Sequence, residues 1–269
     1  MLIVVGGSSG LGHVAGISAA HPAALMHAVA DRPARYVILL TPWYAATAAK
    51  EQAHVMIAAD PSIRVCVLPL FHHPLTLTLL GAVTVEAEGL PGGWADPGEA
   101  VQLLNQSAAR SRSLVWHPRL WGLHDPRPTL GQLASGILPG HGFFAEVGAP
   151  AGYVRGRAGF PANPDEFLCG PGELPSALRH QLGSAAVARV DVTTSPHPAY
   201  ATKGTVELTG LVRPLSPPRP APPCPTCSVS LLATGCGFCG TGPQASPAHQ
   251  PAAARRAGGR RSASEGVRS

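Results

Sequence analysis

Four cysteines near the end of the chain have the spacing of a metal site. Cys224 and Cys227 form one Cys-x-x-Cys pair, Cys236 and Cys239 form another, and eight residues separate the pairs. Two thiolates in one tight turn can face the same ion, and zinc(II) takes four ligands in a tetrahedron. We therefore predict that these cysteines bind zinc, and that metal binding supplies the folding free energy of so short a segment.

Two disulfides or a redox pair are the alternatives for the same cysteines. The apolar start of the chain, residues 1–5, has no charged lead and is too short for a secretory signal. We also find no apolar run near the roughly 18 residues that a membrane-spanning helix needs. The expected location is therefore the cytoplasm, where thiols stay reduced and metal binding is favoured over disulfides.

A glycine-rich loop near the start of the chain could bind phosphate. It follows the apolar run Leu2–Val5, which is typical of a buried strand. Free backbone N–H groups and hydroxyls at the carboxyl end of such a strand can hold a phosphate, and glycines let the ligand approach closely. The alternative is a tight turn without a ligand. The candidate binding residues are Gly6, Gly7, Ser8, Ser9, Gly10 and Gly12.

The elements that would position this loop form an α/β pattern. Continuous apolar runs at 2–5, 36–40 and 63–70 alternate with Ala-rich stretches at 13–30, split by Pro22, and at 43–59. Continuous apolar strands are buried on both faces, and alternation with helices makes them parallel. We therefore predict a Rossmann-like parallel sheet with right-handed crossovers at the N-terminus.

The pattern weakens after residue 71, and we expect a β-rich, less regular middle. Residues 75–88 indicate one long strand or two short ones, 99–111 a helix, and 113–116 a return to the sheet. Residues 188–194 and 205–212 alternate as strands do, which predicts an antiparallel hairpin. The stretch from 117 to 175 is crowded with Pro and Gly and gives no assignment.

The charge lies mainly in the tail. The net charge is +5, and residues 243–269 contain five arginines against the single acid Glu265. A nearly neutral body lacks the basic face of a duplex-binding protein, so only the Arg-rich tail could attract nucleic acid, and weakly. We predict a Rossmann-like domain at 1–116, a Pro/Gly-rich region at 117–214, a proline spacer at 215–223, zinc-ribbon-like knuckles at 224–240 and a disordered basic tail at 241–269.

Two families share local features with the chain. Gly6, Gly10 and Gly12 resemble the G-x-x-x-G-x-G loop of short-chain dehydrogenases/reductases, which would imply NAD(P) binding and hydride transfer. Tyr200 and Lys203 are similar to the active-site pair of that family, but they are three residues apart and not four. On a helix, four residues would place both side chains on one face.

The second resemblance is to CRISPR-associated Rossmann-fold (CARF) sensor domains. An apolar strand ending in a Gly/Ser loop precedes an aliphatic strand ending at Thr41 and Pro42, over about seventy residues. This resemblance implies a nucleotide ligand bound across a homodimer and adds Thr41 to the candidate site. The Gly-Lys loop of that family is not identifiable.

Three functions follow from these features. The first is a nucleotide-binding regulatory or sensor-type protein with a structural zinc site. The second is an NAD(P)-dependent oxidoreductase that uses Tyr200, and the third is an adaptor that recruits a partner protein through the zinc knuckle.

Overall fold

The structure of the chain, a computed structural model, describes most of the sequence up to residue 241. The described residues are 1–5, 14–18, 20–21, 23–31, 34–87, 96–123, 127–135, 142–148, 152–155, 166–210 and 221–241. Within them, no helix is both long and apolar enough to cross a lipid bilayer. The predicted disordered tail lies outside these residues, apart from residue 241.

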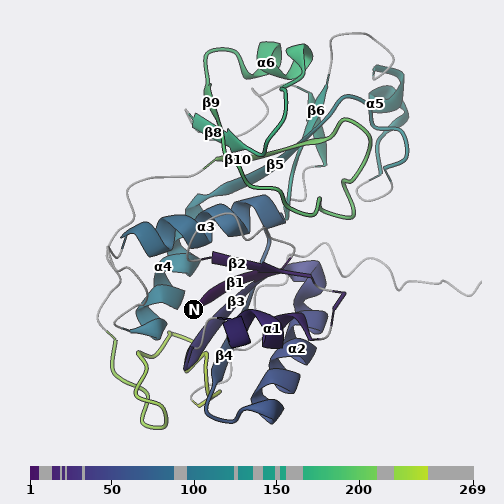
Figure 1. Ribbon diagram of the computed structural model, residues 1–269. Helices are drawn as coiled ribbons and strands as arrows, with labels where there is room; N and C mark the ends of the chain where they lie inside the picture. The colour runs from purple at the N-terminus through teal and green to yellow at the C-terminus, as the bar shows by residue number, and fades with distance from the viewer. Residues whose placement is uncertain are drawn as a thin grey trace, which may run out of the picture.

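A four-stranded parallel sheet forms the N-terminal part of the molecule (Figure 1). Neighbouring strands pair in the order β2-β1-β3-β4, and every pair is parallel. Alternate side chains of each strand are buried on opposite faces, as in an α/β sheet covered on both sides. The strands are β1 (Leu2–Val5), β2 (Val14–Ile17), β3 (Tyr36–Pro42) and β4 (Arg64–Leu70).

Helices cover both faces of this sheet. α1 (Ala24–Asp31) and α2 (Ala46–Ala59), with the short 3-10 turn η1 (Trp43–Ala45) between β3 and α2, pack on one face. α3 (Pro74–Ala87) and α4 (Pro97–Arg110) pack on the other. The predicted α/β class with an N-terminal parallel sheet is confirmed.

The prediction of strand for residues 75–88 was wrong. Leu and Thr alternate there, but the segment forms α3, whose residues 74–81 are all buried. α3 contacts β1 and β3 of the first sheet as well as β10 of a second sheet. A helix enclosed on all sides has no polar stripe, so its sequence lacks the helical period. Two of its threonines bond the preceding turn of the helix: the Thr78 hydroxyl donates to the Pro74 carbonyl at 2.9 Å and the Thr84 hydroxyl to the Leu80 carbonyl at 2.8 Å.

A six-stranded mixed sheet forms the other half of the molecule, with strand order β7-β6-β5-β10-β8-β9. All neighbours are antiparallel except β8 and β9. α6 packs on one face of this sheet, and residues of α5 lie against the other. The elements are β5 (Arg112–His117), α5 (Leu130–Ser135), β6 (Phe143–Glu146), β7 (Tyr153–Arg155), β8 (Glu166–Cys169), α6 (Ser176–Leu182), β9 (Ala186–Arg189) and β10 (Val206–Gly210).

Two strand pairings differ from those predicted. Residues 113–116 do form a strand, but β5 belongs to the second sheet and not to the first. The predicted hairpin of 188–194 with 205–212 does not form, because β9 pairs with β8 while β10 lies between β5 and β8. The alternation of apolar and polar residues predicts which face of a strand is buried, but it does not predict which strand it pairs with.

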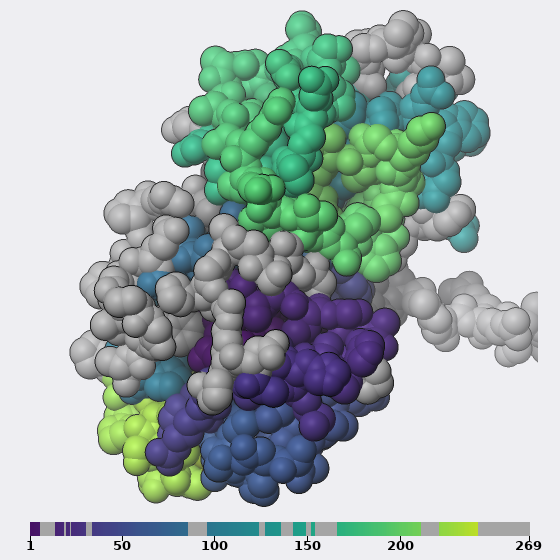
Figure 2. Space-filling model, viewed as in Figure 1, coloured from purple at the N-terminus to yellow at the C-terminus, as the bar shows by residue number. Residues whose placement is uncertain are grey.

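The C-terminal segment 221–241 lies against α4 and the edge of the first sheet at β4, where it appears yellow in Figures 1 and 2. It contains only isolated bridges, Pro223 with Ser230 and Leu232 with Gly235. The predicted domain division at residues 116, 214, 223 and 240 stays a prediction.

Candidate functional site

The predicted phosphate loop is followed by a strand. Gly6, Gly7, Ser8, Ser9, Gly10 and Gly12 lie outside the described residues. β2, which begins at Val14, pairs with β1 in parallel, so the first described element after the loop is a strand and not a helix. A Rossmann-type site needs the N-terminus of a helix at this position. α1 begins only at Ala24, after the break predicted at Pro22.

Thr41 lies at the carboxyl end of β3, as predicted, but it is not accessible to a ligand. Its side chain is fully buried, and its hydroxyl donates to the Pro42 carbonyl at 3.1 Å. The described part of this sheet edge instead presents Tyr44, from η1 after β3, and His73, just after β4. Both side chains point toward the second sheet, where their neighbours lie.

A buried polar network joins the start of α3 to the second sheet. The Thr76 hydroxyl lies 2.8 Å from the Thr209 hydroxyl of β10 and 2.7 Å from the Ser113 hydroxyl of β5. Ser113 Oγ is also 2.7 Å from His72 Nδ1, and His72 Nε2 donates to the Ala108 carbonyl at 3.0 Å. Because each buried group has a partner, this network stabilises the arrangement of the two sheets.

The hydrogen bonds of His73 define a neutral imidazole. Its Nε2 donates to the Leu208 carbonyl at 3.2 Å, and its Nδ1 accepts from the Thr76 backbone N–H at 3.2 Å. Complete burial lowers the pKa of His73 to about 4, which favours the same state. His73 therefore carries no charge at neutral pH.

Glu207 of β10 lies beside this histidine. Its Oε2 is 3.8 Å from His73 Nδ1, and its Oε1 accepts a hydrogen bond from the His197 backbone N–H at 2.9 Å. Burial raises the pKa of Glu207 to about 7. Burial, together with the charge of Glu207, raises the pKa of Tyr44 to about 12. A carboxyl group whose pKa lies near 7 is a common sign of a functional site.

Histidine and tyrosine rings pack together next to Glu207. The His197 ring centroid is 4.5 Å from that of Tyr44 and 4.9 Å from that of Tyr200, and His117 is 6.0 Å from Tyr200. Burial lowers the pKa of both histidines to about 4. Nε2 of His117 and Nε2 of His197 are buried and have no hydrogen-bond partner among the described residues.

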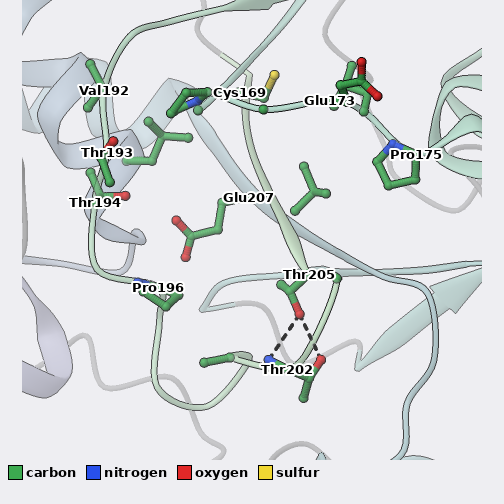
Figure 3. A pocket seen from close by; sticks show the side chains of 18 of the residues that line it. Cys169, Glu173, Pro175, Val192, Thr193, Thr194, Pro196, Thr202, Thr205 and Glu207 are labelled. Carbon is green, nitrogen blue, oxygen red and sulfur yellow. Dashed lines mark hydrogen bonds between the residues drawn. The ribbon is translucent and has the colours of Figure 1, made fainter.

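A cavity of about 680 Å³ opens at Glu207, and we refer to it as the Glu207 cavity (Figure 3). Three segments form its walls, at 169–175, 192–196 and 201–207, together with Leu75 of α3. This volume lies within the range of small-molecule sites, roughly 300–1,000 Å³. Its apolar lining residues include Leu75, Leu174, Val192 and Val206, and its polar ones include Thr193, Thr194, Thr202, Lys203, Thr205 and Glu207.

Tyr200 and Lys203 do not form the predicted dehydrogenase pair. Neither residue is in a helix; both lie in turns that precede β10. Tyr200 is buried against His197, whereas Lys203 is exposed and lines the Glu207 cavity. The two side chains thus have different surroundings and no common helical face.

The four cysteines predicted to bind metal do come together. We refer to Cys224, Cys227, Cys236 and Cys239 as the four-cysteine cluster; their sulfurs all lie within 4.8 Å of one another. All six cysteines of the chain are free thiols. Their role as metal ligands stays a prediction.

Searches with models of known families and among curated proteins found no match to this sequence. Solved structures that are similar in fold include two that hold a fatty acid. The fatty acid kinase (Fak) B3 protein of Streptococcus pneumoniae, loaded with linoleic acid, matches with a TM-score of 0.50 and 10% identity, covering 79% of this chain and 99% of that one. A DegV family protein from Eubacterium eligens, loaded with heptadecanoic acid, matches with a TM-score of 0.52 and 11% identity, over the same shares. The chain therefore has the fold of these lipid-loaded proteins.

These likenesses correct the predicted relationships. The fold is neither that of CARF sensor domains nor that of short-chain dehydrogenases/reductases, with which the chain shares only short local patterns. The isolated bridges of the C-terminal segment join residues within that segment, which packs against α4 and the first sheet and does not resemble a separate zinc ribbon. A homodimer was expected only because of the CARF resemblance, so this expectation no longer has support.

The predicted ligands and functions are corrected as well. The molecules named for the two similar structures are fatty acids, and not zinc, a nucleotide or NAD(P). The nucleotide-binding sensor, the oxidoreductase and the zinc-knuckle adaptor were therefore wrong. Sequence reasoning missed Glu207 and the Glu207 cavity; the only signal was an acid inside an otherwise apolar or hydroxyl-bearing strand, Val206–Gly210.

Proposed function

We propose that this protein binds a long-chain fatty acid in the Glu207 cavity. The observation that carries the proposal is the cavity itself, which is built on a fold that matches two fatty-acid-loaded proteins over 79% of this chain and 99% of theirs. A fatty acid has an apolar chain and one carboxylate. Its site should therefore combine an apolar wall with a few polar groups that fix the orientation.

The acyl chain lies along the apolar wall. Leu75 and Val192 are almost completely buried and pack together where α3 meets the segment after β9. Leu174 and Val206 continue the apolar surface from the other two segments of the cavity. Burial of an acyl chain here is favourable by about 0.8 kcal/mol per methylene group, which provides most of the affinity.

The carboxylate lies at the rim. Lys203 is exposed there, and its ammonium group can pair with the carboxylate. The hydroxyls of Thr194 and Thr202, which also line the cavity, are potential donors to the same group. Glu207 lies further inside, where its raised pKa reduces the repulsion between two carboxylates near neutral pH.

The proposal includes the cytoplasmic location that the sequence predicts. This is a reducing compartment, in which the six cysteines would stay free thiols.

Displacement of a fluorescent fatty acid by palmitate tests the proposal. We expect saturable binding to the wild-type chain, and about tenfold weaker binding for Lys203→Glu, which places a like charge beside the carboxylate. Lys50→Glu is the matched control, because the other lysine of the chain is exposed on α2, away from the cavity. Absence of binding to the wild-type chain would reject the function. Equal affinity of Lys203→Glu and Lys50→Glu would reject the placement of the carboxylate.

A further inference from the structure

The four-cysteine cluster has the dimensions of a metal centre. The sulfurs of Cys224 and Cys239 lie 3.5 Å apart, and those of Cys227 and Cys236 lie 3.4 Å apart. For metal–sulfur bonds of about 2.3 Å, a tetrahedron separates its sulfurs by about 3.8 Å. The cluster therefore needs only a small expansion to enclose one ion.

The two Cys-x-x-Cys turns have the same backbone conformation. In the first, the Ser228 N–H donates to the Cys224 carbonyl at 2.8 Å; in the second, the Gly240 N–H donates to the Cys236 carbonyl at 3.0 Å. The residue after each second cysteine has a positive φ, 63° at Ser228 and 71° at Gly240. Ser228 is the only residue other than glycine with such an angle in the described part of the chain. Two matching turns thus present two sulfurs each to one central point.

The segment that carries the cluster also contacts β3 and the start of α4. The Tyr36 hydroxyl of β3 donates to the Cys227 carbonyl at 3.3 Å, and the Tyr36 ring meets Phe238 edge-on with centroids 5.6 Å apart. Asp96, the N-cap of α4, accepts hydrogen bonds from the backbone N–H and the hydroxyl of Ser230. The segment that carries the cysteines is therefore continuous with the core around α4 and β3.

We propose that the four-cysteine cluster binds one thiolate-preferring metal ion, which holds residues 221–241 in the conformation that packs against α4 and the first sheet. Four sulfur ligands leave no open position for a substrate, so the ion has a structural role. A segment this short has little core of its own, and metal binding would stabilise its fold. Soft thiolates bind several d-block ions, so the chemistry of the ligands defines the class of metal and not the element. The site lies apart from the Glu207 cavity and does not depend on fatty-acid binding.

The test begins with the full-length chain purified under reducing conditions without chelator. Elemental analysis should find about one d-block metal ion per chain. After the ion is removed, Co²⁺ should restore one equivalent, with the absorption bands of a tetrahedral cobalt–thiolate centre. Cys239→Ser should lose these bands. Cys66→Ser should keep them, since Cys66 is the free thiol that packs beside Gly237 without belonging to the cluster. Cys169→Ser, in β8 of the second sheet, is the distant control.

Thiol labelling keeps the test valid if Cys239→Ser fails to fold. In the native wild-type chain, the four cluster thiols should resist alkylation and become reactive when a chelator is added. A wild-type chain without metal or cobalt bands would overturn the proposal, as would alkylation unaffected by chelator. A mass showing two disulfides, from Cys224 to Cys239 and from Cys227 to Cys236, would equally overturn it.

Discussion

Glu207 Oε2 lies 3.8 Å from His73 Nδ1, yet the two side chains do not form an ion pair. The imidazole is already neutral, because its Nε2 donates to one backbone carbonyl and its Nδ1 accepts from a backbone N–H. Glu207 consequently has no cation to offset the cost of burial, and its pKa rises to about 7. The Glu207 carboxyl group in the cavity therefore changes its protonation state near neutral pH.

The first prediction concerns the pH dependence of ligand binding. As the pH falls through about 7, Glu207 becomes protonated and no longer repels a fatty-acid carboxylate, so affinity should increase severalfold between pH 8 and pH 6, on the order of 1 kcal/mol. Glu207→Gln should bind as tightly at pH 8 as the wild-type chain does at pH 6. Displacement titrations at both pH values check this. An identical pH profile for both proteins would contradict it.

The second prediction concerns stability at high pH. The folded-state pKa of Glu207 is raised from 4.5 to about 7, so its contribution to stability is fully present below about 4.5 and is lost as the pH rises through 7. At pH 8, Glu207→Gln should therefore be more stable than the wild-type chain by about 2 kcal/mol. Urea unfolding at pH 8 and pH 5 measures the difference, which should shrink at pH 5. Glu166→Gln, which removes an exposed carboxylate of β8, is the control.

The third prediction concerns stability in acid. The pKa values of His72, His73, His117 and His197 are lowered to about 4, mainly by burial. Their contribution is present above the unfolded-state pKa of 6.5 and is lost as the pH falls toward 4, because the unfolded chain binds more protons. We expect the free energy of unfolding of Glu207→Gln, which lacks the opposing carboxyl group, to fall by several kcal/mol between pH 6.5 and pH 4. A flat profile would show that these histidines are charged or exposed in the folded state.

The fourth prediction tests the polar network between the sheets. Thr209→Val keeps the shape of the side chain but removes the hydroxyl that bonds Thr76 at 2.8 Å inside a fully buried site. We expect a loss of about 1–3 kcal/mol of stability in urea unfolding. Thr193→Val, at an exposed position, should change stability by no more than about 0.5 kcal/mol. Similar effects of both substitutions would mean that the network contributes little.

The fifth prediction tests the contact of the C-terminal segment with α4. A Cβ atom on Gly98 would collide with the backbone carbonyl of Ser230, and backbone atoms cannot move aside cheaply. Gly98→Ala should therefore destabilise the chain by about 1–3 kcal/mol and expose the 221–241 segment to proteolysis. Gly131→Ala in α5 meets no atom within 4 Å, and it should be neutral or stabilising by up to about 1 kcal/mol. Equal protease resistance of the two variants would argue against this contact.

Three strands of the first sheet, β1, β3 and β4, could be predicted because their signals are local, whereas β2 lies in an Ala-rich stretch that was predicted to be helical. Residues 36–40 and 65–70 are continuous apolar runs between helical stretches, and only a parallel sheet covered on both faces buries such runs. α3 could not be predicted, because enclosure between two sheets removes the polar face that gives a helix its period. The predicted hairpin of residues 188–194 with 205–212 was wrong for a related reason. The strand that β10 pairs with is determined by contacts distant in sequence.

The candidate sites also divide into features that local sequence patterns predict and features that depend on contacts distant in sequence. The four sulfurs do lie close together, because the two cysteines of each pair are near neighbours in the sequence, and their role as metal ligands stays a prediction. The Glu207 cavity is assembled from three separate segments and one residue of α3, and no pattern within any one of them indicates a ligand. The glycine-rich loop was interpreted as a phosphate-binding loop because a helix was expected after it. The next described element is instead the strand β2.

The most direct test of fatty-acid binding is native mass spectrometry of the purified chain, followed by organic extraction and identification of the released molecule. We predict one long-chain fatty acid per chain, or stoichiometric uptake of palmitate by a delipidated sample, with reduced retention in Lys203→Glu and not in Lys50→Glu. A delipidated chain that remains folded and takes up no fatty acid would contradict the account.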